Sequence, residues 1–308
     1  MLLKRLFENL FFITGTAKSL EPGFLKKYPA TNTDWARYFR ALYTPFLGVQ
    51  TIILIFFLNI SPLNAQSLLT YDRDEPPTME MLLEAREVFE YEVSYGFFTL
   101  GWVDVELRPD TTYNEKEVYH LRTTIRSNRR VPFVGTRIVN YENLFSYNRF
   151  FPYSYVFWRD DIHDEEYEVV KVEFDRDHDE VRFYEKGEFQ NSLDLVEPSS
   201  GGDLIFYYSR LFAGLEDPYR KPAFIEGEMG MVAASSSPKT EMRKYDAFEN
   251  PIETYLSEGS ADVDGPFGFR GDFKSWFSTD DLRVPVEAHV RVIFGNVKVR
   301  LISYERHN

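Results

Sequence analysis

Apolar and polar residues alternate with a period of two along most of the chain beyond residue 88, a pattern typical of half-buried β-strands. The clearest case is residues 89–95, where aromatic and valine side chains alternate with glutamate and serine. Residues that favour turns separate such segments. The pattern predicts about eleven strands, among them 89–95, a single strand over 224–233 and a last strand at 297–304.

One segment follows a helical period instead. Leu204, Tyr207 and Leu211 recur at intervals of three and four residues, and Gly214 follows as a stop, which predicts a helix over 204–215. Asp203 or Ser200 is expected to cap its first turn. Strands without alternating helices argue against an α/β enzyme fold. We therefore expect a mainly β domain over 89–306, with this one helix packed on its sheet and a linker over 67–88 before it.

The N-terminal region has the pattern of an export leader. Residues 41–71 carry no charged side chain, the run 46–60 is almost purely apolar, and Arg37 and Arg40 precede it. This order, with the small residue Ala65 after the run, predicts a secretory signal within residues 1–66 that is cleaved after Ala65. The alternative is an uncleaved anchor helix over 42–63. In both cases the later residues are exported, either into the periplasm or out of the cell.

Composition narrows the possible functions. The chain has 308 residues and a net charge of −14, so a polyanion would be repelled and nucleic acid is not an expected partner. The absence of cysteine excludes disulfides, thiolate metal sites and cysteine nucleophiles. A strongly acidic surface also favours a soluble monomer.

The sequence lacks the common motifs of catalytic and nucleotide-binding sites. The sequence contains no Gly-x-Ser-x-Gly elbow, no His-Glu-x-x-His and no Walker loop. The run 175–180 resembles a calcium loop but fails at its glycine and final glutamate positions. The acidic run 160–166, with Asp160, Asp161 and Asp164, is interpreted as a charged loop; a hydrolase that uses it stays as an alternative. We expect no enzyme activity, no metal and no cofactor.

The most distinctive stretch lies near the C-terminus and contains Trp276, Ser278, Asp280, Asp281, Arg283 and Pro285. It is interpreted as a structural hairpin, with ligand contact by Arg283 as the alternative. Its residues, together with Asp203 and Arg210 of the predicted helix, resemble the signature of the domain of unknown function 3108 family. The resemblance implies an exported bacterial envelope protein with an open, strongly curved antiparallel sheet, similar to lipoprotein-carrier half-barrels, in which a helix covers an apolar concave face. It implies no catalytic residue.

An unclosed barrel must fill its concave face with its own side chains, a helix or a ligand. The large aromatic content leads us to expect a non-enzymatic protein that binds or carries a lipid or acyl chain. The alternative is a structural or assembly factor of the cell envelope that acts through protein contacts. The residues expected to line the groove are Trp102, Phe145, Trp158, Tyr207, Phe212 and Trp276.

Overall fold

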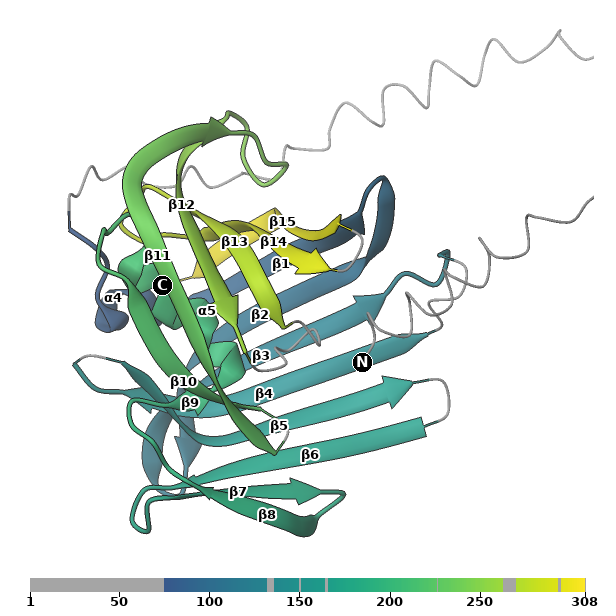
Figure 1. The fold of residues 1–308 in the computed structure, drawn as a ribbon, viewed down its shortest axis with the longest axis vertical. Coiled ribbons are helices and arrows are strands. Elements are labelled where there is room, and N and C mark those ends of the chain that lie inside the picture. The colour runs from purple at the N-terminus through teal and green to yellow at the C-terminus, as the bar shows by residue number, and fades with distance from the viewer. Residues whose placement is uncertain are drawn as a thin grey trace, which may run out of the picture. The chain divides into compact units, whose positions relative to one another are not determined.

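Fifteen strands form one continuous sheet in the computed structural model of the chain (Figure 1). The structure describes residues 75–131, 136–149, 151–163, 166–225, 227–262, 270–292 and 295–307. The predicted leader over 1–66 and its cleavage after Ala65 lie outside these residues. Within the part of the chain that is described, no helix has the length and apolar character needed to cross a membrane.

The sheet consists of two meanders joined by the first and last strands. Strands β1 and β15 pair antiparallel in its middle, with Arg86 opposite His307 and Tyr95 opposite Val297. From this pair, β2 to β8 follow in sequence on one side, and β14 back to β9 follow on the other. Every neighbouring pair is antiparallel except β9 and β10. The strands are β1 Arg86–Tyr95, β2 Phe98–Tyr113, β3 Lys116–Ser127, β4 Arg137–Tyr147, β5 Pro152–His163, β6 Glu166–Asp175, β7 Glu180–Glu185, β8 Glu188–Asp194, β9 Ser200–Gly201, β10 Tyr219–Ile225, β11 Glu228–Arg243, β12 Ile252–Ala261, β13 Gly271–Ser278, β14 Pro285–Val292 and β15 Gly295–His307.

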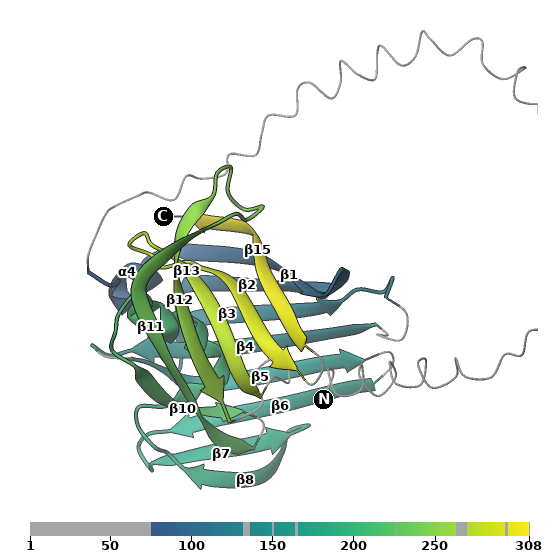
Figure 2. The same ribbon diagram turned by 45° about the horizontal axis from the view of Figure 1, so that its top comes forward.

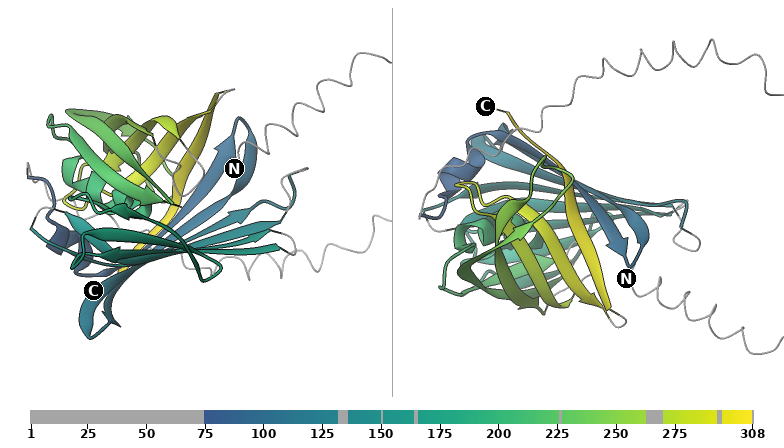
Figure 3. Two further views of the ribbon diagram at one scale, coloured as in Figure 1. Left: turned by 60° about the horizontal axis from the view of Figure 1, so that its bottom comes forward. Right: turned by 90° about the horizontal axis from the view of Figure 1, so that it is seen from above.

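The sheet bends back on itself without closing. Strands β10 to β13 lie as a layer over the N-terminal half of the sheet, with the helical segment between the two layers (Figures 2 and 3). The two end strands, β8 and β9, do not pair with each other. The prediction of a mainly β, unclosed barrel is thus confirmed.

The edge formed by β9 and β10 packs against the inner face of β4 to β7. The ring of Phe224 in β10 lies 5.8 Å from that of Phe174 and 6.4 Å from that of Phe183, measured between centroids. In β9 the Gly201 amide donates to Ser154 Oγ at 2.9 Å. A Cβ at Gly201 would lie 2.7 Å from the side-chain nitrogen of Asn143, so only glycine allows this approach. The β9–β10 edge therefore packs against the face of the sheet and does not pair with the edge strand β8.

The predicted number of strands is too low, for identifiable reasons. The expected single strand over 224–233 is a hairpin of β10 and β11, in which Gly227 adopts a φ of 92°. Strand β8 has almost no buried residue, so it has no apolar alternation to recognise. Strand β9 has two residues.

The predicted helix over 204–215 is shorter and less regular than expected. It consists of a 3₁₀ turn η2 at Gly202–Leu204, one α-helical turn α5 at Ile205–Tyr208 and a second 3₁₀ turn η3 at Ser209–Phe212. Neither Asp203 nor Ser200 caps it, because Asp203 lies within η2 and no side chain bonds its N-terminus. Residues with modest helix propensity fill α5, so its conformation depends on tertiary contacts.

Part of the predicted linker over 67–88 belongs to the domain. Helix α4 at Met79–Leu83 is capped by the Thr78 hydroxyl, which accepts from the Met81 amide at 3.2 Å. Leu82 and Leu83 are fully buried in the main core. The folded domain therefore includes the residues from α4 onward rather than starting at residue 89.

Replacing Phe224 with alanine should release the β9–β10 edge from the inner face. Because Phe224 is fully buried, Phe224→Ala is expected to lower the free energy of unfolding by about 3–5 kcal/mol. Phe189→Ala is the matched control, since Phe189 is 57% exposed on β8, and it should change the same quantity by at most about 0.5 kcal/mol. Urea denaturation followed by tryptophan fluorescence measures both; equal effects would contradict this account of the edge.

Candidate functional site

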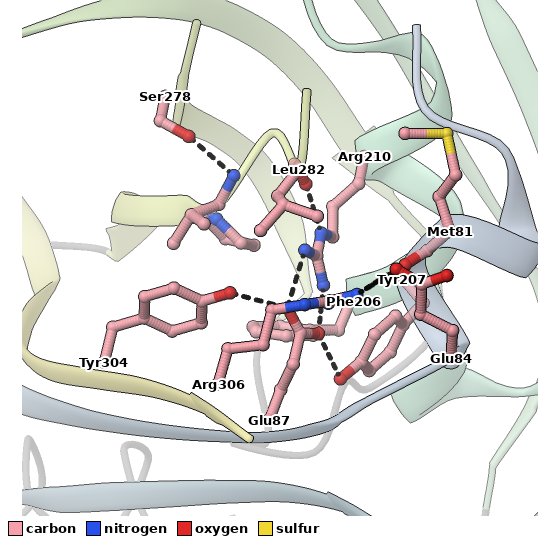
Figure 4. Close-up of polar contacts among 12 residues, drawn as sticks. Met81, Glu84, Glu87, Phe206, Tyr207, Arg210, Ser278, Leu282, Tyr304 and Arg306 are labelled. Carbon is pink, nitrogen blue, oxygen red and sulfur yellow. Dashed lines mark hydrogen bonds and ion pairs between the residues drawn. The ribbon is translucent and has the colours of Figure 1, made fainter. Parts of the chain in front are cut away.

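A buried carboxylate lies at the centre of a polar cluster that joins β1, β15 and the helical segment (Figure 4). Glu87 of β1 has no exposed surface, and its Oε2 accepts hydrogen bonds from Arg210 Nη1 at 2.8 Å and from the Tyr207 hydroxyl at 3.0 Å. Its Oε1 accepts from Tyr304 at 2.8 Å and from Arg210 Nη2 and Arg306 Nη1, both at 3.1 Å. We call these five residues the Glu87 cluster.

The Glu87 cluster fixes the helical segment to the sheet. Tyr207 and Arg210 come from α5 and η3, whereas Tyr304 and Arg306 come from β15. Burial acts to raise the pKa of Glu87, but Arg210, Arg306 and Tyr304 together outweigh it, and the net shift is downward. Two of the predicted site residues, Tyr207 and Arg210, thus have their polar atoms committed to a structural contact.

The C-terminal signature builds the turn that receives Arg210. Ser278 Oγ accepts from the Val284 amide at 2.7 Å, and Asp280 Oδ1 accepts from the Leu282 amide at 2.8 Å. The Leu282 carbonyl in turn accepts from Arg210 Nε at 2.9 Å. This arrangement agrees with a structural hairpin.

The remaining signature residues complete the same turn. Arg283 has a φ of 48°, donates to the Asp280 carbonyl at 3.0 Å and lies over the Tyr255 ring at 4.6 Å. Asp281 is half-buried. Pro285 sits opposite a bulge in β13, and its carbonyl accepts from the Tyr91 hydroxyl at 2.8 Å.

A cavity of about 230 Å³ lies between the helical segment and the concave face of the sheet. The helical segment forms one wall through Gly202, Asp203, Ile205, Phe206 and Ser209, and strand residues form the others. Small side chains on neighbouring strands leave the space, namely Ala223, Ser275 and Ala288. The other residues used below to describe its wall are Val103, Val105, Tyr219, Phe273, Phe277, Val290 and Val299.

None of the six residues predicted to line a groove lines this cavity. Three of them are adjacent in sequence to residues that do: Trp102 precedes Val103, Tyr207 follows Phe206, and Trp276 precedes Phe277. In strands, adjacent residues point to opposite faces, so choosing the larger side chain selected the wrong face. Trp276 instead packs against the His289 ring at 4.6 Å and under the Arg243 guanidinium at 4.2 Å.

The other three predicted lining residues are also elsewhere. Phe145 is fully buried against the Tyr119 ring at 5.6 Å. Phe212 packs against Tyr219, with centroids 5.0 Å apart. Trp158 is half-buried and lies opposite Glu142, whereas its neighbour Phe157 enters the core. The small residues on successive strands were the feature that could have located the cavity.

A second polar group borders the cavity. Asp203, also a signature residue, is buried and accepts from Asn143 Nδ2 at 2.7 Å, and burial raises the pKa of Asp203 to about 7. Lys221 is buried nearby and donates to the Pro152 carbonyl at 3.1 Å, while its ammonium lies 4.4 Å from the Tyr208 ring centre. Burial lowers the pKa of Lys221 to about 7.

The acidic run 160–166 is not a free loop. Residues 160–163 belong to β5, and Asp161 is buried and accepts from Arg137 Nε at 2.7 Å. Asp164 lies outside the described residues. Among the residues that the structure describes, no three histidine, aspartate or glutamate side chains are grouped to hold a metal ion.

No protein-family model matches the chain, and no curated protein is significantly similar to it. The resemblance to the domain of unknown function 3108 family therefore stays a prediction. Among solved structures, the chain is similar to a β-barrel-like protein of domain of unknown function DUF1849 from Brucella abortus. The two are 10% identical, the match covers 76% of this chain and 99% of the other, and the TM-score is 0.47.

Removing Arg210 should destabilise the fold through Glu87. Arg210→Met leaves a fully buried carboxylate short of its main cationic partner and is expected to lower the free energy of unfolding by about 3–5 kcal/mol in urea titrations. Adding Glu87→Gln to that variant should recover part of the loss. Arg126→Met is the control, because Arg126 is half-exposed beside Asp104, and it should cost at most about 1 kcal/mol. A double variant less stable than Arg210→Met would contradict this.

Asp203 should make stability depend on pH. Its pKa is about 7 in the fold against an ordinary 3.8, so its stabilising contribution is complete below about pH 4 and is lost as the pH rises to 7. Asp203→Asn removes this loss. The difference in free energy of unfolding, variant minus wild type, should grow by on the order of 4 kcal/mol between pH 4 and 7. Asp217→Asn, at an exposed site, should show no such growth.

Proposed function

We propose that this chain is a non-enzymatic binding protein that takes up an apolar ligand, a lipid tail or acyl chain, in the cavity beneath α5. The observation that carries the proposal is the predominantly apolar surface that faces the cavity. The polar residues of its wall are Thr123, Asp203, Ser209, Ser257, Ser275 and Glu287. Covering an apolar surface of this kind with hydrocarbon removes it from water and is favourable.

The size of the cavity supports a single chain as the ligand. Its volume of about 230 Å³ exceeds the roughly 150 Å³ of an engineered apolar cavity that binds benzene. It is below the range of about 300–1,000 Å³ that is common for sites of drug-sized ligands. A segment of one acyl chain fits this space better than a whole two-chain lipid.

The polar groups around the cavity favour binding over catalysis. Two carboxylates line the cavity: Asp203 accepts from Asn143 Nδ2 at 2.7 Å, and Glu287 accepts from Arg243 Nη2 at 2.7 Å. Behind the wall, Tyr207 and Arg210 both bond Glu87. A catalytic acid or base needs a proton that it can exchange with a substrate, and a carboxylate that accepts five hydrogen bonds has no such freedom. We therefore propose a role without a chemical step.

The proposal includes export, as the sequence of the first 66 residues predicts. A bacterial envelope protein related to the domain of unknown function 3108 family would encounter lipids and acylated molecules in that compartment. The proposed protein acts as a monomer there, either in the periplasm or outside the cell.

A substitution inside the cavity tests the proposal. Titration of a fluorescent fatty acid into the chain freed of lipid should give saturable binding. Ala288→Trp, which places a large ring in the cavity, should weaken that binding at least about tenfold, because it removes the apolar volume available to the ligand. The control is Ala233→Trp, on β11 next to the cavity-lining Val232, which lies on the opposite face and should leave the affinity unchanged.

The experiment distinguishes a wrong binding site from a wrong function. Equal affinity of wild type and Ala288→Trp would place the ligand elsewhere and contradict the proposed site. No saturable binding by the wild type, with no lipid found by mass spectrometry of the purified chain, would contradict the function itself. The alternative of an assembly factor acting through protein contacts would then be favoured.

A further inference from the structure

Exposed apolar side chains gather at one end of the sheet. Eight large hydrophobic residues are strongly exposed among the described residues, and six of them lie in or beside turns. Those turns join β1 to β2, β5 to β6, β7 to β8, and β10 to β11. Because successive strands alternate in direction, all four turns lie at the same end, opposite to α4 (Figure 1). We call the six residues the apolar rim: Phe97, Phe98, Ile162, Tyr167, Phe189 and Met229.

The β1–β2 turn is the most exposed part of the apolar rim. Phe97 is 88% exposed and Phe98 is 50% exposed, and their ring centroids are 4.1 Å apart. Gly96 takes a φ of 59° and allows the tight turn that presents them. Two adjacent phenylalanines at a turn tip add nothing to the core, so their exposure calls for a partner.

Cationic side chains flank these two rings. Asn128 donates through Nδ2 to the Thr99 carbonyl at 2.8 Å, which places the following Arg129 and Arg130 beside β2. On the other side, Lys298 of β15 is paired in register with Ser94. All three cations are exposed, and none forms an ion pair with an acidic side chain of the described part of the chain. In a chain of net charge −14, this is a local reversal of sign, and it is confined to the β1–β2 turn. The other three turns of the apolar rim carry acidic residues: Asp164, Glu165, Glu166, Glu185, Glu188, Glu226 and Glu228.

We propose that the β1–β2 turn of the apolar rim docks on the surface of an anionic lipid bilayer, with Phe97 and Phe98 inserted below the headgroups and the acidic turns of the rim facing away from the bilayer. Proteins are held at membrane interfaces when aromatic rings insert into the bilayer and neighbouring cations contact the anionic headgroups. Two adjacent rings at the tip of one turn suit insertion into a soft, continuous surface, whereas a protein partner would be expected to meet a larger packed patch. The cavity residues Phe273, Val290 and Val299 lie on strands that reach this same end, and they are only half-buried.

Docking does not depend on the proposed ligand. The rim can bind a bilayer whether or not the cavity holds an acyl chain, so the two proposals fail separately. If both hold, the apolar rim brings the half-buried side of the cavity to the source of its ligand.

The absence of cysteine makes a site-specific test direct. The full chain with Phe97→Cys carries an environment-sensitive fluorophore at the rim, and the full chain with Met242→Cys carries the same fluorophore at a site that is 61% exposed near the end of β11. Each is mixed with vesicles of equal parts phosphatidylcholine and phosphatidylglycerol, and with vesicles of phosphatidylcholine alone. The apolar run 46–60 is present in both variants, so a difference between them reports the orientation of the domain rather than attachment of the chain.

The label at residue 97 should shift to the blue and be quenched by spin-labelled lipid in the mixed vesicles, and the label at residue 242 should not. Adding Arg129→Glu and Arg130→Glu should reduce the fraction of inserted label at residue 97 by roughly tenfold or more, as should high salt. No shift at residue 97 in mixed vesicles, or an equal shift at both sites, would overturn the proposal. An equal shift at residue 97 in phosphatidylcholine alone would contradict the role given to the cations.

Discussion

Glu87 accepts five hydrogen bonds from four side chains in a fully buried environment, and the positions of the helical segment and of β15 follow from this contact. A carboxylate buried without partners would be strongly unfavourable, so its partners must all be in place together. The Leu282 carbonyl, at the signature turn, extends the same network through Arg210. Segments separated by more than 200 residues, such as β1 and Arg306, are thus held in one arrangement.

This constraint explains why a cavity can persist. The helical segment has only one α-helical turn and would be unstable alone. Arg210 and Tyr207 hold it at a fixed distance from the sheet, so it covers the concave face without collapsing onto it. The space that remains is bounded by small residues on successive strands, and the Asp203 contact with Asn143 fixes the first residues of the segment against β4. The strand residues that form the walls are thus held by strand pairing, whereas the helical segment that covers the cavity is held by its contacts with Glu87 and Asn143.

The two ends of the sheet have opposite characters. The end near α4 holds the Glu87 cluster, and the opposite end presents the exposed rings of the apolar rim, with Arg129, Arg130 and Lys298 near the β1–β2 turn. The sheet stays open because the β9–β10 edge packs face-on through Phe224 and Gly201 instead of pairing with β8. In a closed barrel the interior would be separated from the apolar rim. In the bent, open sheet the half-buried residues of the inner face stay close to the apolar rim.

The sequence alone determined the class of the fold, because a period of two in apolar residues is a local property that needs no knowledge of partners. It also predicted a helix over 204–215, where the structure has the helical segment Gly202–Phe212, and a turn at Asp280 and Asp281, since both depend on local spacing and turn propensity. Arg210 was singled out by the resemblance to a family and not by spacing. The sequence could not say which face of a strand points inward where both faces carry apolar residues, so Trp102 and Trp276 were chosen where Val103 and Phe277 line the cavity. The sequence alone also did not predict the Glu87 cluster or the apolar rim. Both arise when residues distant along the chain are brought together by strand pairing, and only the tertiary structure decides that.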